Sequence, residues 1–128
     1  MIGLLSGRRI LVVEDEMLVL MNLEMALEDL GCSAICAAAT VAEALALLAG
    51  QRFDAAIVDV NLGGEKSYPV ADALSQLGIP FAFSTGYGDH GDRVDLDDRP
   101  VLRKPYLRAE LVAVLKLLLA DEPLPAAA

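Results

Sequence analysis

Short apolar runs alternate with amphipathic segments along most of the 128 residues of this chain. Five apolar runs, bounded by glycine, proline or charged residues, predict strands over residues 9–14, 33–37, 53–59, 80–84 and 100–104. Apolar residues at helical spacing predict helices over residues 16–30, 40–49, 68–77 and 107–120. Strands that alternate with helices in this way indicate a parallel sheet covered on both faces.

The order of these elements narrows the fold class. We predict an α/β, flavodoxin-like (βα)5 fold, with a doubly wound five-stranded parallel sheet in the order 2-1-3-4-5. Residues 89–99 hold only Val94 and Leu96 as aliphatic residues, so we predict a short or irregular fourth helix there. Residues 1–120 are predicted to form one domain, and the Pro/Ala-rich residues 121–128 a disordered tail.

The composition argues against several classes of function. A net charge of −9 disfavours nucleic-acid binding, which needs basic surfaces to neutralise phosphates. Charged residues interrupt the most aliphatic stretch, residues 107–120, so we predict no membrane-spanning segment. Residues 1–7 lack the basic start of a secretory signal. We therefore expect a cytoplasmic protein that binds neither nucleic acid nor membranes.

Ionisable residues stand at the ends of three predicted strands. Glu14 and Asp15 follow the first strand, Asp59 ends the third, and Lys104 ends the fifth. Because parallel strands share one carboxyl edge, we expect these side chains to meet in a single crevice. Three carboxylates there would repel one another, and a divalent cation relieves that repulsion. Hard oxygen ligands suit Mg²⁺ best, so the pattern predicts a magnesium site.

Such a crevice has the parts that phosphoryl transfer requires. An ionised carboxylate, here Asp59, can attack phosphorus and form an aspartyl-phosphate. The transferring group needs its oxygens neutralised, which Mg²⁺ and the cation of Lys104 would provide. The hydroxyl of Thr85, at the end of the fourth strand, would add a neutral donor.

At these positions the sequence resembles the response regulator receiver domain over residues 8–120. The matching motifs are Leu11-Val12-Val13-Glu14-Asp15-Glu16, Ile57-Val58-Asp59, Ser84-Thr85-Gly86 and Arg103-Lys104-Pro105. The resemblance implies a flavodoxin-like fold and a role in two-component signalling. It also implies that the Lys104-Pro105 peptide bond is cis.

The same resemblance assigns a role to each site residue. Asp59 is implied to be the phosphoacceptor, with Thr85 binding a phosphoryl oxygen and Lys104 pairing with it. Asp15 is implied to bind Mg²⁺ directly and Glu14 to bind it through water. Asn61 is implied to offer the ion its backbone carbonyl, alongside Asp59.

The sequence also departs from most members of that family. An aromatic residue usually stands three positions before the lysine, and here Val101 occupies that position. Residues 80–88 are similar to a subgroup of stand-alone receivers whose fourth strand ends in a Phe-Ala-Thr-Gly type motif. We therefore expect Tyr87, two residues after Thr85, to act as the switch that reports phosphorylation. Gly63 and Gly64 predict a looser loop after the third strand than is usual.

With no effector module expected after residue 120, three modes of output follow from the resemblance. The domain would be a phosphorelay intermediate, a phosphate sink, or a switch that binds a target when phosphorylated. Its expected partners are a histidine kinase, a histidine phosphotransfer protein, or both. The first helix, with Leu18, Asn22, Met25 and Asp29 on one mixed face, is the expected docking surface.

The last helix raises the question of oligomeric state. Val112, Leu115 and Leu119 are among its many apolar positions and could support a dimer. The expectation is a monomer or a weak homodimer.

Two other classes of function remain as alternatives. The first is a pseudo-receiver, a binding module with this fold that is never phosphorylated. The second is a phosphatase of the haloacid dehalogenase type, which also uses an Mg²⁺-bound aspartate nucleophile. Such phosphatases carry a second aspartate two residues later, where this chain has Asn61. The main expectation is a phosphoacceptor domain rather than an enzyme.

Overall fold

The computed structural model describes residues 3–86 and 99–120. The strands of its main sheet are β1 (Arg9–Val13), β2 (Ala34–Ala38), β3 (Ala55–Asp59), β6 (Phe81–Thr85) and β7 (Val101–Arg103). A separate hairpin consists of β4 (Asn61–Leu62) and β5 (Glu65–Lys66). The helices are α1 (Met17–Asp29), α2 (Val41–Gly50), α3 (Tyr68–Leu77) and α4 (Arg108–Ala120).

The five strands of the main sheet are all parallel and lie in the order β2-β1-β3-β6-β7. In chain order this is the 2-1-3-4-5 arrangement, so the predicted flavodoxin-like fold is confirmed. The central strand β3 is buried at all five positions, as expected of a strand with helices on both faces. The order of connection reverses beside β1, so the strand ends on either side of it border one crevice.

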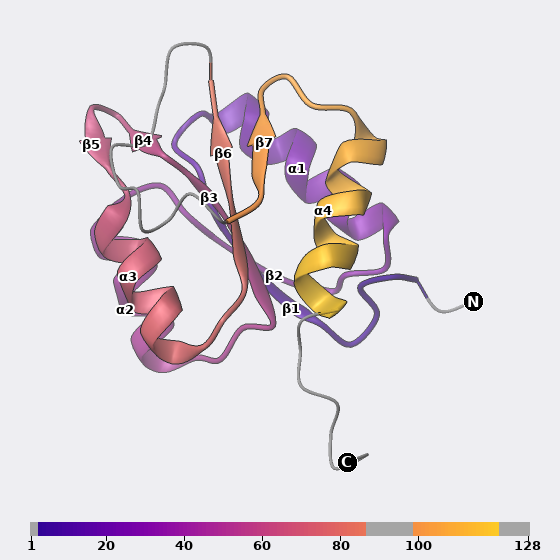
Figure 1. The fold of residues 1–128 in the computed structure, drawn as a ribbon, viewed down its shortest axis with the longest axis horizontal. Helices are drawn as coiled ribbons and strands as arrows, with labels where there is room; N and C mark the ends of the chain where they lie inside the picture. The colour runs from indigo at the N-terminus through magenta and orange to yellow at the C-terminus, as the bar shows by residue number, and fades with distance from the viewer. Residues whose placement is uncertain (1–2, 87–98, 121–128) are drawn as a thin grey trace.

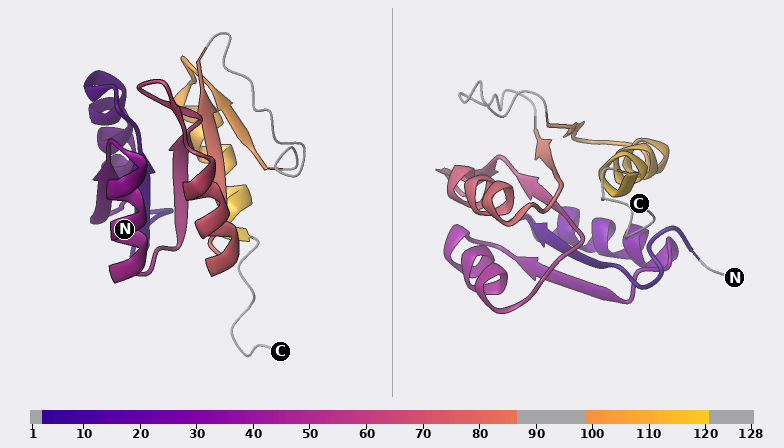
Figure 2. Two further views of the ribbon diagram at one scale, coloured as in Figure 1. Left: turned by 90° about the vertical axis from the view of Figure 1, so that its left-hand side faces the viewer. Right: turned by 60° about the horizontal axis from the view of Figure 1, so that its bottom comes forward.

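The helices form one layer on each face of the sheet (Figures 1 and 2). Helices α1 and α4 cover one face, and α2 and α3 cover the other. Alternate strand residues supply the two cores: Ile10 and Val12 belong to the α1/α4 core, whereas Leu11 and Val13 belong to the α2/α3 core. The β3 residues Ala55 and Ile57 face α1 and α4, and Asp59 continues that alternation at the end of the strand.

Local signals at the helix ends agree with the predicted boundaries. Thr40 caps α2, with its hydroxyl accepting a hydrogen bond from Glu43 N at 3.1 Å. The Glu43 carboxylate accepts a reciprocal bond from Ala39 N at 2.8 Å. After α1, Gly31 adopts a φ of +98°, which favours glycine and ends the helix where the sequence predicts.

The segment after β3 differs from the prediction. Instead of a loose loop, it forms the β4–β5 hairpin around Gly63 and Gly64, whose φ angles are +59° and +94°. Two consecutive residues with positive φ make the tight turn that best fits a two-residue hairpin. Asn61 Oδ1 accepts a hydrogen bond from Gly64 N at 3.0 Å and closes the turn. The two glycines therefore tighten this loop.

One further prediction is wrong in part, and two others concern residues that the structure does not describe. Leu115 is fully buried against the sheet, so it belongs to the core of the domain and is not part of a dimer surface. The predicted irregular helix at 89–99 falls almost entirely outside the described residues. The predicted tail at 121–128 lies outside them as well.

The cap of α2 allows a test of the local energetics. Replacing Thr40 with Ala removes the hydroxyl that accepts from Glu43 N, and we expect the free energy of unfolding to fall by about 1 kcal/mol. Urea unfolding monitored by circular dichroism measures this change. Thr40→Ser retains the acceptor and is expected to stay close to the unmodified protein. Equal losses in the two variants would show that the cap hydrogen bond does not stabilise α2.

Candidate functional site

The candidate site lies where the main strands end. Glu14 and Asp15 directly follow β1, Asp59 is the last residue of β3, and Lys104 directly follows β7. Thr85 is the last residue of β6 and is buried. The predicted convergence of these strand ends therefore agrees with the fold, although they are separated by up to ninety positions in the chain.

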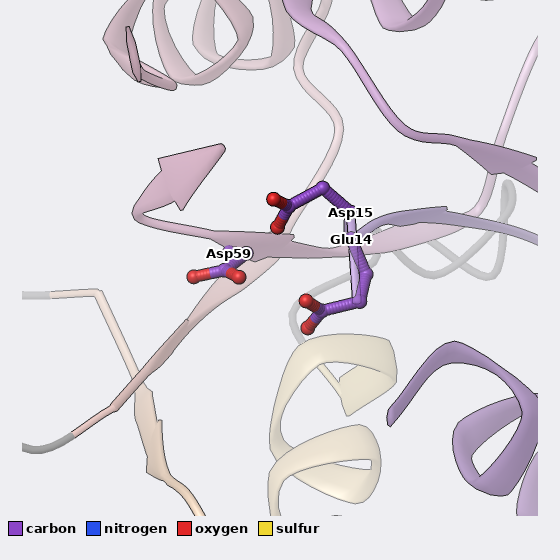
Figure 3. A group of neighbouring side chains, drawn as sticks. All are labelled: Glu14, Asp15 and Asp59. Atoms are coloured by element: carbon purple, nitrogen blue, oxygen red, sulfur yellow. The ribbon is translucent and has the colours of Figure 1, made fainter. Parts of the chain in front are cut away.

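The three acids form a cluster in which each offers one carboxylate oxygen, and these oxygens lie within 4.8 Å of one another. Figure 3 shows the three carboxyl groups facing a common space at the strand ends. Glu14 and Asp59 are each only 3% exposed, whereas Asp15 is open to solvent. Because buried like charges repel strongly, the cluster needs positive charge beside it.

Lys104 supplies part of that charge. Its Nζ lies 2.9 Å from Glu14 Oε1 and 3.0 Å from Asp59 Oδ2. Burial of the ammonium opposes its charge, but hydrogen bonds to the carboxylates of Glu14 and Asp59 outweigh this effect and raise the pKa of Lys104. The lysine therefore stays charged and holds the two buried acids together.

The fourth acid of the site is Glu16, whose Oε1 lies 3.3 Å from Lys104 Nζ. It was not among the predicted site residues, because no local sequence pattern shows that its side chain reaches Lys104. Its backbone N also donates a hydrogen bond of 3.1 Å to Glu14 Oε2. Three carboxylates thus contact one ammonium, and Asp15 adds a fourth to the cluster, which leaves an excess of negative charge.

The pKa of Glu14 responds first to burial and then to the charged neighbours of this residue. Burial raises the pKa of Glu14 to about 7, with the Lys104 hydrogen bond opposing the shift and nearby Asp59 adding to it. A cation bound among these acids would favour the ionised form of Glu14, since it adds the positive charge that the ammonium alone does not supply.

The hairpin after β3 orients the other oxygen of the central aspartate. Asn61 N donates a hydrogen bond of 3.2 Å to Asp59 Oδ1. The Asp59 carboxylate is thereby held from two sides, by a backbone amide at one oxygen and by Lys104 at the other. A Cβ added to Gly63 would lie 3.6 Å from Asp15 Oδ2, so the turn of the hairpin adjoins the acidic cluster.

The ends of β6 and β7 are tied together by the backbone. Lys104 N donates a hydrogen bond of 2.8 Å to Thr85 O, and the Thr85 hydroxyl donates to Gly86 O at 3.1 Å. The Lys104-Pro105 peptide bond is cis, which confirms that expectation. Val101, which stands where an aromatic residue is usual, is exposed at the start of β7. Tyr87 lies outside the described residues.

A groove of about 660 Å³ opens beside the site, between α1 and the segment that joins β7 to α4. Glu16 and Lys104 line its end nearest the acidic cluster. Asn22, Met25, Tyr106 and Arg108 are among its other lining residues. Burial raises the pKa of the Tyr106 hydroxyl. The groove therefore joins the charged site to a surface formed largely by α1.

Solved structures resemble this chain closely. SdrG from Sphingomonas melonis Fr1 is 48% identical with a TM-score of 0.80, over 88% of this chain and 96% of that one. The BeF3-activated conformation of SdrG from Pseudomonas melonis Fr1 is 47% identical with a TM-score of 0.75, and the match covers 89% of this chain and 98% of that one. The receiver domain of sensor histidine kinase PA1611 from Pseudomonas aeruginosa PAO1 is 26% identical with a TM-score of 0.78, and the match covers 91% of this chain and 100% of that one. That last structure has a magnesium ion coordinated in its active site cleft.

A search of curated proteins gives no match. In the described residues, no helix has the length and apolar character needed to cross a membrane. The model of the response regulator receiver domain matches residues 10–116, and its span includes every site residue described above. The chain belongs to the response regulator receiver domain family.

Proposed function

We propose that this chain accepts a phosphoryl group on Asp59 from a phosphohistidine, with Mg²⁺ bound beside the acceptor. Receiver domains interact with histidine kinases or phosphotransfer proteins, which makes a phosphohistidine the expected donor. The observation that carries the proposal is the contact of Lys104 with both Glu14 and Asp59, at the sheet edge that Asp15 also borders.

The residues of the site fit Mg²⁺. Three carboxylate oxygens lie within 4.8 Å of one another, and hard oxygen ligands are those that Mg²⁺ prefers. We propose that Asp15 and Asp59 bind the ion directly and that Glu14 binds it through water. The backbone carbonyl of Asn61 would complete the protein ligands. Bound there, Mg²⁺ would supply positive charge for the oxygens of the transferring group.

The chain's own residues orient and neutralise the acceptor. A carboxylate oxygen of Asp59 attacks phosphorus, the new O–P bond forms, and the N–P bond of the donor breaks with its electron pair returning to the imidazole. The Asn61 amide holds the carboxylate in position during the attack. The ammonium of Lys104, already 3.0 Å from Asp59, pairs with the charge that moves onto the phosphoryl oxygens, and the Thr85 hydroxyl binds another of these oxygens.

The outer face of α1 is the proposed docking surface for the donor. Leu18 and Met25 of the predicted mixed face are 76% and 58% exposed, although both are large and apolar. The helix carries Glu24, Glu28 and Asp29 but no lysine or arginine. These features fit an amphipathic partner helix whose apolar face is flanked by basic residues.

Neither alternative class of function is favoured by the site. A pseudo-receiver has no need of an intact acceptor, yet Asp59 is held by Lys104 and lies within the acidic cluster. A dehalogenase-type phosphatase needs a second carboxylic acid at position 61. Here the Asn61 amide oxygen accepts from Gly64 N and closes a hairpin turn, so it is not an acid or base.

The output of phosphorylation follows from the same proposal. The domain would pass the phosphoryl group to a further protein, drain it from a shared kinase, or bind a target while phosphorylated. The role of Tyr87 as the reporter of phosphorylation and the monomeric or weakly dimeric state stay predictions.

Loss of the acceptor tests the proposed chemistry directly. With acetyl phosphate and Mg²⁺, the protein is expected to gain the mass of one phosphoryl group, and Asp59→Asn is expected to gain none. Intact-protein mass spectrometry under acidic conditions measures the adduct. Asp29→Asn removes the same charge from an exposed pair with Arg108 at the last residue of α1, and should leave the adduct unchanged. An adduct that persists in Asp59→Asn would place the acceptor elsewhere.

Replacement of the central ammonium separates cation binding from transfer. Lys104→Met removes the charge that opposes a second cation, so we expect Mg²⁺ to bind more tightly by about tenfold. The same variant should accept the phosphoryl group from acetyl phosphate more slowly, because no ammonium neutralises its oxygens. Calorimetric titration measures the first effect and time-resolved mass spectrometry the second.

The matched control is Lys116→Met, which removes an exposed ammonium from α4. It should change neither Mg²⁺ affinity nor the rate of phosphorylation. If Lys104→Met bound Mg²⁺ less tightly than the unmodified protein, the ion would not compete with the ammonium for these carboxylates.

A further inference from the structure

All the methionines that the structure describes lie on one helix. They are Met17, Met21 and Met25, which occur at every fourth position of α1. Their side chains are 66%, 49% and 58% exposed, respectively. Residues four apart lie above one another on a helix, so these three thioethers form a continuous row, here called the methionine stripe.

The stripe points away from the core. Leu23, Ala26 and Leu27 are the buried residues of α1 and fix the face that packs on the sheet. At about 100° per residue, the methionine stripe lies on roughly the opposite side of the helix. Packing within the domain therefore does not require apolar residues there. Methionine is flexible and polarisable, and proteins often use it on surfaces that bind other helices.

The stripe is continuous with the functional site. Met17 follows Glu16, whose carboxylate contacts Lys104, and Met25 lines the groove beside that lysine. A donor helix that reaches the phosphoacceptor along this groove would bury the sulfur atoms on α1.

We propose that oxidation of the methionine stripe by hydroperoxides controls docking of the phosphoryl donor, an inference that rests on the proposed function. The lone pair of each thioether sulfur attacks the distal oxygen of the hydroperoxide, the S–O bond forms and the O–O bond breaks. The proton of the distal oxygen moves to the departing oxygen, which leaves as water or an alcohol. Sulfur loses two electrons and the peroxide gains them.

Sulfoxidation changes the docking surface without changing the acceptor. It converts a flexible apolar side chain into a polar one, which disrupts interfaces rich in methionine. In the part of the chain that the structure describes, the hydrogen bonds and ion pairs of Asp59 and Lys104 involve no methionine. Phosphorylation from a small donor, which needs no docking, therefore continues while transfer from a protein donor declines.

The two cysteines are the competing targets of a peroxide. Cys32 is 4% exposed, and burial raises the pKa of its thiol, which keeps the reactive thiolate scarce. Cys36 is half-buried in β2, on the face that α2 covers. The methionine stripe is more exposed than either thiol.

The test compares small and protein donors before and after treatment with hydrogen peroxide. Peptide mapping is expected to find sulfoxide at Met17, Met21 and Met25, and acetyl phosphate should still phosphorylate the oxidised protein within about twofold of the original rate. Transfer from the autophosphorylated histidine kinase that donates fastest in a screen should slow by about tenfold or more at limiting kinase concentration, because burial of even one Met side chain strengthens association by that order. Methionine sulfoxide reductases of both epimer specificities should restore the rate.

The control protein carries Met17→Leu, Met21→Leu and Met25→Leu together, which keeps the stripe apolar but removes its sulfur. Its rate of transfer from the kinase, measured first without treatment, should be the same after peroxide. If peroxide slowed transfer to the control protein equally, the effect would belong to other residues and the inference would be overturned. Undiminished transfer to protein oxidised at all three methionines would overturn it as well. If a kinase phosphorylates Asp59 as fast after peroxide as before, the proposed function stands and the inference fails alone. If Asp59 is never labelled, the proposed function fails first.

Discussion

The ammonium of Lys104 lies between the carboxylates of Glu14 and Asp59, and the rest of the site is arranged around that contact. Both acids are almost fully buried, so leaving either without a positive partner would be costly. One ammonium cannot balance four carboxylates. Burial raises the pKa of Glu14 to about 7, and the neighbouring Asp59 adds to that shift. Under the proposed function, a bound cation would supply the positive charge that Lys104 alone does not provide.

The parallel sheet makes this contact possible. β3 is paired on both sides and buried along its whole length, so Asp59 has little freedom of position where the strand ends. β7 is shorter and lies at the edge of the sheet, but the bond from Lys104 N to Thr85 O fixes its end against β6. The sheet thus positions residues that are far apart in the chain, because each of them ends a strand or directly follows one.

The fold and most of the site could be predicted because their signals are local. Asp59 and Lys104 each end an apolar run, and a parallel sheet brings such ends together whatever their separation. Glu16 was missed because its role depends on a side chain reaching across to Lys104, which no local pattern records. The turn at Gly63 and Gly64 was predicted to be loose, since composition shows freedom but not the φ angles actually adopted. Leu115 could not be assigned to a face because α4 is apolar around most of its circumference.

The two sides of α1 show how one helix meets separate demands. On the inner side, Leu23 and Leu27 fill the core, where shape and volume restrict the choice of residue. On the outer side no such restriction applies, and polar residues would be the ordinary choice for a surface helix. Leucine would give an apolar surface equally well, as Leu18 does, so apolarity alone does not account for a row of sulfur atoms. Methionine differs from leucine in its adaptable packing and in its oxidation by peroxides. Of these two properties, only oxidation produces a change that enzymes can make and reverse after the protein has folded.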